Sequence, residues 1–316
     1  MLAVDLGGSG SRARWTPLAG GGVRPEGART ATGPGLRVSA AGLVAAPLVE
    51  TLLIELDLGA GDVAAACLGL SGLLTLADGA AGLADVVHTR LGVAPTVVAS
   101  DAVTSTVGAL GGTAGAVVLA GTGCTALGTD LGETWRKVDG WGHVLGDAGS
   151  GSWIGGRALT AALEHHDGRR ADAAALLAAA RSRFGEPDAL IREVYTRDDR
   201  AGLLASFAQD AVGLAREGDP VAAGIVAAAG GELARTLAAA LRDPVPARAS
   251  YTGGIFGAGE VLTAPFTAEL SRLRPDVVLA PPLGGALDGA ELLALRALAG
   301  TLTPRPPLVT VLPAPS

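Results

Sequence analysis

An aspartate followed by glycines and serines stands near the start of the chain, in the sequence DLGGSGS at residues 5–11. Glycines let backbone N–H groups approach a phosphate closely, and Ser9 and Ser11 add hydroxyl donors. Asp5 ends a short apolar run, where its carboxylate could hold Mg²⁺ directly or through water. An ordinary glycine-rich hairpin without a ligand explains the same residues, so this stretch alone leaves both interpretations open.

The residues after this loop decide what kind of phosphate site it could be. Gly8, Gly10 and Ala13 fit the G-x-G-x-x-G/A dinucleotide pattern, which requires a helix to begin directly after the glycines. Residues 11–18 instead alternate with the period of a strand, and Pro17 opposes a helix. The sequence therefore predicts a tight hairpin between two strands and argues against a nicotinamide-dependent dehydrogenase.

A second apolar run with a glycine-rich loop appears at residues 115–130, in GAVVLAGTGCTALGTD. It repeats the logic of the first hairpin and predicts the start of a second domain. We expect an α/β protein with domains at 1–112 and 113–300, and a Pro-rich tail at 301–316 that lies extended on the surface or frays. Two such hairpins facing across a cleft would hold a nucleoside triphosphate from both sides.

Composition narrows the class of protein. The chain has 316 residues and a formal net charge of −7, and no run of Lys or Arg stands out, which argues against a nucleic-acid surface. Cys67 and Cys124 are the two cysteines, so a disulfide framework or a C-x-x-C zinc site is not expected. Charges interrupt the long Ala/Leu stretches, and Met1 leads straight into the first strand without a signal peptide, so we expect a cytoplasmic protein with no membrane span.

Four loops, taken together, resemble the actin/hexokinase/Hsp70 ATPase superfamily: DLGGSGS (5–11), SDAVTS (100–105), AGTGCTA (120–126) and YTGGIFG (251–257). Over about residues 2–300, the chain looks more closely like the N-acetylglucosamine and glucosamine kinase group of the BadF/BadG/BcrA/BcrD ATPases. The most specific segment is GWGHVLGDAGSGSWIG at 140–155.

This resemblance implies two actin-like (ribonuclease H-like) domains with a nucleotide and sugar cleft between them. The implied activity is ATP-dependent phosphorylation of an amino sugar, glucosamine or N-acetylglucosamine, at the 6-hydroxyl. ATP and Mg²⁺ would be the cofactors, and a small-molecule amino sugar would be the partner. Kinases that resemble this chain are often homodimers, so a homodimer is expected.

The resemblance also implies which residues bind the nucleotide. Asp5 would help to position Mg²⁺. The two phosphate clamps and the nucleoside contact would be formed by Gly7, Gly8, Ser9 and Gly10, by Gly121, Thr122 and Gly123, and by Gly253 and Gly254. Phosphoryl transfer depends mostly on positioning and charge neutralisation, which backbone clamps and a metal ion provide.

For the sugar, the resemblance implies that Asp101 takes the proton from the attacking hydroxyl, as a general base at a strand end. Asp147 would accept hydrogen bonds from sugar hydroxyls. Four further residues would line the sugar pocket: Ser71, Gly72, Gly142 and His143.

Local structure offers another explanation for several of these residues. Asp101 could cap the helix expected at 102–110, and Asp147 could stabilise a glycine-rich turn. His143 is more readily explained as a hydrogen-bonded structural histidine than as a catalytic one. Cys124 fits a small packed residue better than a nucleophile.

Two departures from the family pattern leave the sugar open. Ala148 stands where glutamate is common, and Thr125 stands where the N-acetylglucosamine kinases tend to carry asparagine. The acceptor could therefore be another hexose. A second alternative is an ATPase switch of the BadF type, although Cys67 and Cys124 are poorly placed to hold an iron–sulfur cluster at a subunit interface.

Overall fold

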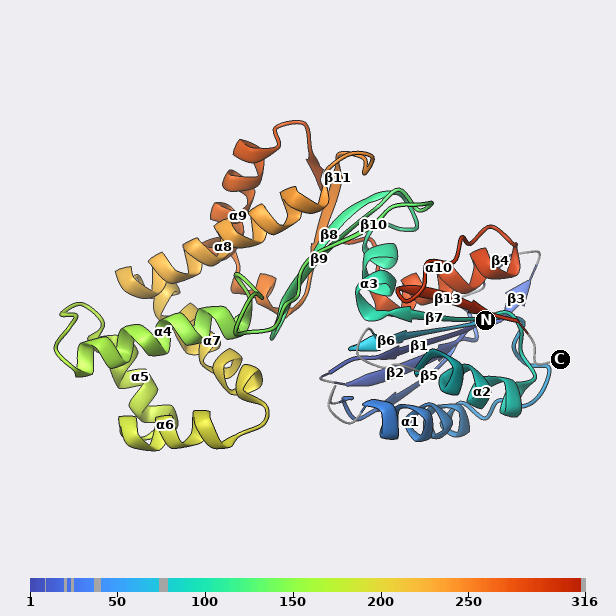
Figure 1. Ribbon diagram of the computed structural model, residues 1–316, viewed down its shortest axis with the longest axis horizontal. Helices are drawn as coiled ribbons and strands as arrows, with labels where there is room; N and C mark the ends of the chain where they lie inside the picture. The colour runs from blue at the N-terminus through green and yellow to red at the C-terminus, as the bar shows by residue number, and fades with distance from the viewer. Residues whose placement is uncertain (9, 20–21, 24–25, 37–40, 74–78, 314–316) are drawn as a thin grey trace. The chain divides into compact units, whose positions relative to one another are not determined.

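The computed structural model describes residues 1–8, 10–19, 22–23, 26–36, 41–73 and 79–313, which form two compact units (Figure 1). The first unit comprises Met1–Ala114, Thr129–Trp135 and Pro281–Ser316. The second comprises Gly115–Gly128 and Arg136–Ala280.

The first unit is built on a six-stranded mixed sheet with the order β13-β7-β6-β1-β2-β5. Strands β1, β6 and β7 are parallel, while β2, β5 and β13 pair antiparallel with their neighbours. The strands are β1 (Leu2–Leu6), β2 (Ser11–Trp15), β5 (Arg29–Gly33), β6 (Ala66–Leu70), β7 (Thr96–Ser100) and β13 (Val309–Leu312). A small separate hairpin is formed by β3 (Leu18–Ala19) and β4 (Gly22–Val23).

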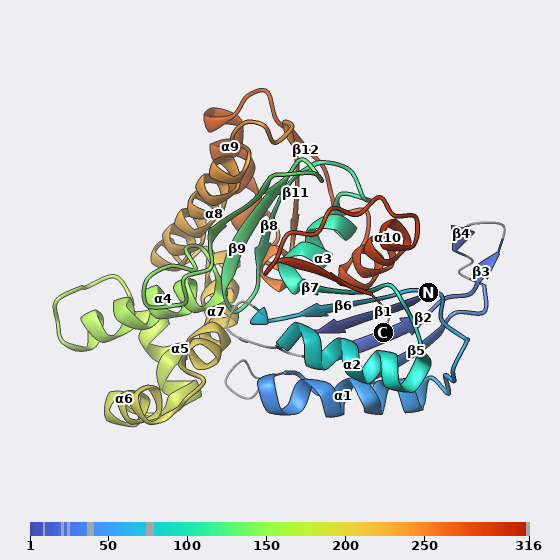
Figure 2. The same cartoon turned by 45° about the vertical axis from the view of Figure 1, so that its right-hand side comes forward.

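Helices cover both faces of this sheet (Figure 2). They are α1 (Ala41–Glu55) and α2 (Gly79–Leu91) on one face, and α3 (Asp101–Ala109) and α10 (Ala286–Leu298) on the other. Alternate residues of β1, namely Leu2, Val4 and Leu6, are fully buried in one cluster with leucines of α1 and α2. This alternation turns Asp5, the residue between Val4 and Leu6, towards the α3 and α10 face.

Helices α3 and α10 pack unusually closely, because glycines meet at their crossing. A Cβ atom on Gly108 would overlap the carbonyl oxygen of Gly285, and one on Gly289 would overlap that of Thr104. Arg14 of β2 also forms ion pairs with Asp288 and Glu291, at 2.9 and 2.8 Å. These contacts explain why α10 belongs to the first unit.

The second unit contains a five-stranded sheet with the order β10-β9-β8-β11-β12. Strands β8, β11 and β12 are parallel, and β8 and β9 are joined by the second glycine-rich turn. The strands are β8 (Gly115–Ala120), β9 (Cys124–Thr129), β10 (Trp135–Asp139), β11 (Arg248–Thr252) and β12 (Val278–Leu279).

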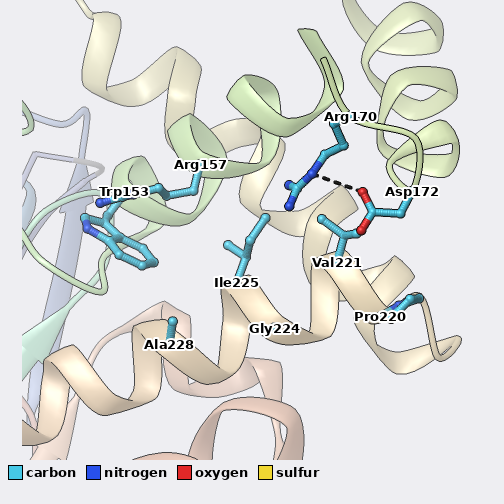
Figure 3. A pocket seen from close by; sticks show the side chains of 9 residues that line it. All are labelled: Trp153, Arg157, Arg170, Asp172, Pro220, Val221, Gly224, Ile225 and Ala228. Carbon is cyan, nitrogen blue, oxygen red and sulfur yellow. Dashed lines mark ion pairs between the residues drawn. The ribbon is translucent and has the colours of Figure 1, made fainter. Parts of the chain in front are cut away.

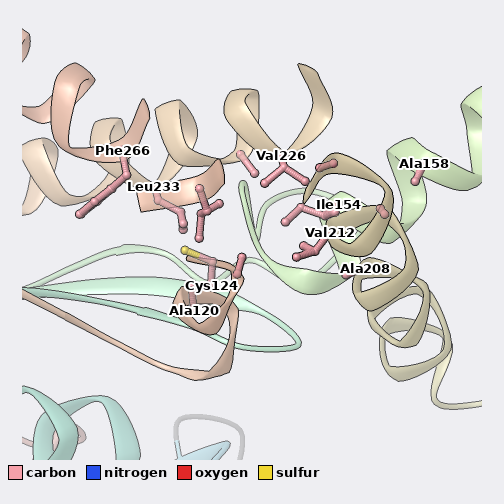
Figure 4. Close-up of a cluster of buried hydrophobic side chains, with 14 of the residues drawn as sticks. Ala120, Cys124, Ile154, Ala158, Ala208, Val212, Val226, Leu233 and Phe266 are labelled. Atoms are coloured by element: carbon pink, nitrogen blue, oxygen red, sulfur yellow. The ribbon is translucent and has the colours of Figure 1, made fainter. Parts of the chain in front are cut away.

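The helices of the second unit enclose a large apolar core, part of which Figure 4 shows. They are α4 (Gly151–His166), α5 (Ala174–Phe184), α6 (Pro187–Thr196), α7 (Arg200–Arg216), α8 (Pro220–Ala240), the 3₁₀ helix η3 (Gly254–Ala258) and α9 (Glu260–Leu273). Among the described helices, α8 alone is long and apolar enough to cross a membrane. Its Val226, Leu233 and Leu237 are fully buried in this core, so α8 serves here as a core helix.

The structure differs from the expected domain limits at the end of the chain. Residues 281–300, expected in the second domain, join the first unit. The expected loose tail at 301–316 contains β13, which pairs antiparallel with β7, and Val309 is fully buried. The apolar, β-branched run LVTVL favours a strand, but the prolines before it conceal this signal.

The close approach of α3 and α10 predicts a large effect from a single methyl group. Gly289→Ala should destabilise the protein by about 1–3 kcal/mol, because the new Cβ must displace the Thr104 carbonyl or the whole helix. Gly82→Ala in α2 is the matched control. A Cβ there would meet no atom within 4 Å, so this change should stabilise by about 0.5–1 kcal/mol. Urea denaturation followed by circular dichroism measures both; equal effects of the two substitutions would contradict the packing argument.

Candidate functional site

In the first unit, three loops leave the sheet at the same edge. Leu6 at the end of β1 is aligned with Leu70 of β6, and Leu70 is aligned with Ser100 of β7. Because the three strands are parallel, the segments that begin at Gly7, Ser71 and Asp101 all emerge at their carboxyl ends. This edge is where open α/β sheets usually bind ligands.

Asp101 is the first residue of α3 and is hydrogen bonded on both carboxylate oxygens. Its Oδ1 accepts the Ala102 N–H at 2.8 Å, and the Ser71 hydroxyl donates a short hydrogen bond to Oδ2. The N-cap of α3 is Ser100, whose Oγ accepts the Val103 N–H. The capping explanation therefore applies to Ser100, while the Asp101 side chain is directed to Ser71.

Burial raises the pKa of the Asp101 carboxyl above its ordinary value, and the negative charge of Asp5 adds to this shift. The hydrogen bond from Ser71 acts in the opposite direction, because it stabilises the ionised form. A carboxylate with a raised pKa is a stronger base than an exposed one.

Asp5 is only 5% exposed and forms an ion pair with Arg12, its partner across the β1–β2 ladder, at 2.7 Å. The Asp5 carboxylate is a hard oxygen donor at the strand edge. One carboxylate together with substrate phosphates is a common way for proteins to bind Mg²⁺. The donor chemistry thus fits a magnesium ion, which would replace the Arg12 guanidinium beside the Asp5 carboxylate. Sequence reasoning did not identify Arg12 as the ion-pair partner of Asp5. The only local signal was the alternation of Arg12 with Ala13, which predicts a strand but not the residue opposite Arg12.

The first glycine loop is the tight turn of the β1–β2 hairpin, as predicted. The Gly7 N–H donates to the Gly10 carbonyl at 3.1 Å, and the Leu36 N–H donates to the Gly7 carbonyl at 2.9 Å. Gly8 is exposed and has open space around its Cα. Ser9 lies outside the described residues.

In the second unit, the β8–β9 turn of Gly121, Thr122 and Gly123 is tied to the start of α4. The Gly151 N–H donates to the Gly121 carbonyl at 2.8 Å, and the Ser152 N–H donates to the Thr122 carbonyl at 3.0 Å. Gly121 and Thr122 are exposed, so this turn presents backbone groups on a firmly held support.

Asp147 lies directly beneath this turn. A Cβ on Gly123 would come within 2.8 Å of the Asp147 Oδ2 atom, and the carboxylate accepts hydrogen bonds from the backbone of Cys124 and Gly142. Burial and the charge of Asp139 raise the pKa of Asp147. The structure thus gives Asp147 the turn-stabilising role that local chemistry suggested, whether or not it also binds a sugar.

Asp139 was missed by sequence reasoning, although it organises the loop from 140 to 148. Its two carboxylate oxygens accept the N–H groups of Asp147 and Ala148, both at 2.9 Å. Lys137 donates to the Gly140 carbonyl at 3.1 Å and lies over the ring of Trp141. The loop is therefore well anchored.

The anchored loop nevertheless exposes apolar side chains. Trp141, Val144 and Leu145 are 70%, 77% and 84% exposed. His143 is also exposed, and its electrostatic interaction with Asp147 acts to lower the pKa of that carboxyl. The interpretation of His143 as a structural rather than catalytic residue stays a prediction. Gly142 faces the Asp147 carboxylate, and Gly72 follows Ser71 in the first unit.

Gly253 follows β11 and approaches the neighbouring strand β8 so closely that only glycine fits. Its φ is +109°, and a Cβ would overlap the Ala120 carbonyl. Gly254 then begins η3, with open space around it. Arg216 of α7 holds this segment by donating to the carbonyl oxygens of Gly257 and Ala258, at 2.7 and 2.8 Å. Arg216 is a third residue that sequence reasoning missed, after Arg12 and Asp139.

Cys124 is 4% exposed, and burial raises the pKa of its thiol. A thiol that stays protonated is a poor nucleophile, so the prediction of a small packed residue agrees with its surroundings. Thr125 donates to the Val138 carbonyl at 3.2 Å, which joins β9 to β10.

Comparison with known proteins gives one family match along most of the chain. The sequence profile of the BadF/BadG/BcrA/BcrD ATPase family matches residues 4–277. The N-acetylmuramic acid/N-acetylglucosamine kinase of Clostridium acetobutylicum is 31% identical over 108 residues, 34% of this chain and 35% of that relative. The match thus spans about a third of the relative's length.

Solved structures extend the similarity over both units. A protein from Chromobacterium violaceum, named as a candidate N-acetylglucosamine kinase, is 26% identical with a TM-score of 0.70, over 94% of this chain and 98% of that one. A ROK family glucokinase from Streptomyces griseus, in complex with glucose and AMPPNP, is 21% identical with a TM-score of 0.56, over 93% and 98%. The predicted fold class, α/β with two actin-like domains, is confirmed.

The Ser71 hydrogen bond predicts a shift in the titration of Asp101. Ser71→Ala should raise the pKa of the Asp101 carboxyl further, because the ionised form loses its hydroxyl donor. Titration of the ¹³C-labelled carboxyl by NMR measures this change. Ser105→Ala, which removes a hydroxyl elsewhere on α3, should leave the titration unchanged. A lower pKa in Ser71→Ala would show that Ser71 does not stabilise the carboxylate.

Proposed function

Because this chain belongs to the BadF/BadG/BcrA/BcrD ATPase family, we propose that it is an ATP-dependent kinase that phosphorylates an amino sugar. The acceptor is glucosamine or N-acetylglucosamine, and the accepting group is the 6-hydroxyl. The observation that supports this most strongly is the partly buried Asp101 carboxylate, hydrogen bonded to Ser71 at the carboxyl edge of three parallel strands.

In the proposed reaction, Asp101 is the general base. The sugar hydroxyl oxygen bonds to the γ-phosphorus of ATP, the bond from that phosphorus to the β,γ-bridging oxygen breaks, and ADP leaves. The hydroxyl proton passes to Asp101, whose raised pKa favours taking it. Ser71 orients the carboxylate, and Ser71 and Gly72 contact the sugar.

The nucleotide is held by backbone groups. Gly7, Gly8, Ser9 and Gly10 of the first hairpin, and Gly121, Thr122 and Gly123 of the second, surround the phosphates. The Gly7 and Gly121 N–H groups close their own turns, and the other N–H groups donate to phosphate oxygens. Gly253 and Gly254 allow the nucleoside to lie against the backbone. When bound, Mg²⁺ would neutralise charge on the β- and γ-phosphate oxygens, and Asp5 would hold it once Arg12 moves to a phosphate.

The remaining sugar contacts come from the anchored loop of the second unit, through Gly142, His143 and Asp147. The exposed position of His143 makes it available to a ligand. The kinase names of two similar proteins support a sugar with an N-acetyl group, whereas Thr125 and Ala148 depart from the pattern of those kinases. Glucosamine and other hexoses therefore belong in the test. We further expect a cytoplasmic homodimer.

The ATPase-switch alternative receives no support from the cysteines. Cys67 is fully buried in β6 and Cys124 is 4% exposed in β9. An iron–sulfur cluster shared between subunits needs thiolates at the surface, and burial raises the pKa of both thiols.

A coupled ADP-release assay with a panel of sugars tests the proposed function. The panel is glucosamine, N-acetylglucosamine, N-acetylmannosamine, N-acetylmuramic acid, glucose and no sugar, each with ATP and Mg²⁺. Release that depends on an amino sugar is the expected result. ADP release that is equal with and without sugar would instead identify an ATPase, and mass spectrometry of the product shows which hydroxyl is phosphorylated.

The role of Asp101 predicts a loss of turnover without a loss of fold. Asp101→Asn should lower kcat by a factor of about 10²–10⁴ and leave ATP binding intact, because the amide cannot accept the hydroxyl proton. Asp85→Asn, on the exposed face of α2, is the matched control and should retain full activity. Activity of Asp101→Asn within a few-fold of the original would mean that Asp101 is not the base.

A further inference from the structure

A hollow of about 370 Å³ lies in the second unit, between α4 and the first half of α8 (Figure 3). Trp153 and Arg157 of α4 form one side, Arg170 and Asp172 come from the segment after α4, and Gly224 and Ile225 of α8 form the other side. Volumes of this size are typical of sites for small molecules.

The hollow exists because α8 presents small residues to a helix that carries large ones. Gly224 is exposed, and a Cβ built on it would meet no atom within 4 Å. Beneath this surface, Ile154 of α4 and Val226 of α8 are fully buried in the core. The two helices are therefore packed together below the hollow, while the space above Gly224 holds no atom within 4 Å of a Cβ built there.

The charges that line the hollow are not balanced. The Arg170 guanidinium pairs with two carboxylates, Asp172 at 3.0 Å and Glu164 at 3.9 Å. Arg157 is exposed, its guanidinium carbon lies 4.9 Å from the centroid of a Trp153 ring, and it has no ion pair within the described part of the chain. The two carboxylates neutralise the charge of Arg170, whereas Arg157 keeps a positive charge without an ion-pair partner among the described residues, on a protein whose formal net charge is −7.

We propose that this hollow binds a phosphorylated monosaccharide. A guanidinium group binds phosphate oxygens in a planar, two-pronged geometry, which is the role for Arg157. Trp153 and Ile225 offer apolar surface to the C–H face of a pyranose ring. Asp172 accepts hydrogen bonds from sugar hydroxyls, as carboxylates do. Inorganic phosphate would contact Arg157 but would not cover the apolar surface of Trp153 and Ile225, so a sugar phosphate fits the hollow better.

The position of the hollow connects it to the phosphate turn of the same unit. Trp153 and Arg157 lie in the first two turns of α4, and the N–H groups of Gly151 and Ser152 at the start of that helix are bound to Gly121 and Thr122. A sugar phosphate in the hollow therefore contacts α4, the helix that supports the β8–β9 turn. If the proposed kinase function holds, its own product belongs to this ligand class, but the binding argument does not require that function.

Isothermal titration of the whole chain with N-acetylglucosamine 6-phosphate and with glucose 6-phosphate tests the proposal. Arg157→Gln should weaken binding of at least one of them by about tenfold or more, because the phosphate loses its free guanidinium. The matched control is Arg192→Gln, which removes an exposed arginine from α6 of the same unit. It should leave binding unchanged. Gly224→Leu, which fills the hollow, should abolish binding at this site without disturbing the core.

The same titrations separate this site from a product-binding active site, whose occupancy would not depend on Arg157 or Gly224. Failure of both sugar phosphates to bind, or binding that neither substitution weakens, would overturn the proposal. Inorganic phosphate binding as tightly as the sugar phosphates would overturn it too. The proposed kinase function fails separately, through absence of sugar-dependent ADP release.

Discussion

The candidate site of the first unit depends on one constraint: three parallel strands end at the same register position. Because β1, β6 and β7 end in register, the hairpin turn, Ser71 and Asp101 all lie at one edge of the sheet, and no long loop is needed to bring them there. Backbone pairing therefore does most of the positioning. A single hydroxyl–carboxylate hydrogen bond then orients the group with the raised pKa.

In the second unit, the buried Asp147 and the half-buried Asp139 hold the β8–β9 turn and the loop after β10 in place. The β8–β9 turn exposes Gly121 and Thr122, yet glycines give such a turn little rigidity of its own. Asp147 supports the turn from below, and Asp139 in turn holds Asp147 and Ala148 through their backbone N–H groups. Burial, together with the nearby negative charge of Asp139, disfavours the ionised form of Asp147 and raises its pKa. The backbone hydrogen bonds offset that cost.

Local features of this fold were readable from the chain, and long-range ones were not. The glycine hairpin followed from the alternation after Gly10, and the helix expected at 102–110 corresponds to α3. Ser100 and Asp101 both suit a helix N-cap, so the chain alone did not reveal that the serine takes it. The return of α10 depends on Gly108 meeting Gly289 about 180 residues away, and no periodicity records such a contact. The pairings made by Arg12 and Asp139 are equally invisible until the strands are in register.

The return of α10 and β13 to the first sheet makes the second unit an insertion within the first. The chain leaves the first unit after Ala114 and rejoins it for good at Pro281. A cut between these two points divides the first unit into separate pieces, whereas most of the second unit is one continuous stretch from Arg136 to Ala280. Apart from Thr129–Trp135, which belongs to the first unit, the whole interval from Gly115 to Ala280 belongs to the second unit, and the first unit is assembled from segments on both sides of it. Sequence change should therefore accumulate more independently in the inserted helices than in the two distant segments that must continue to fit each other.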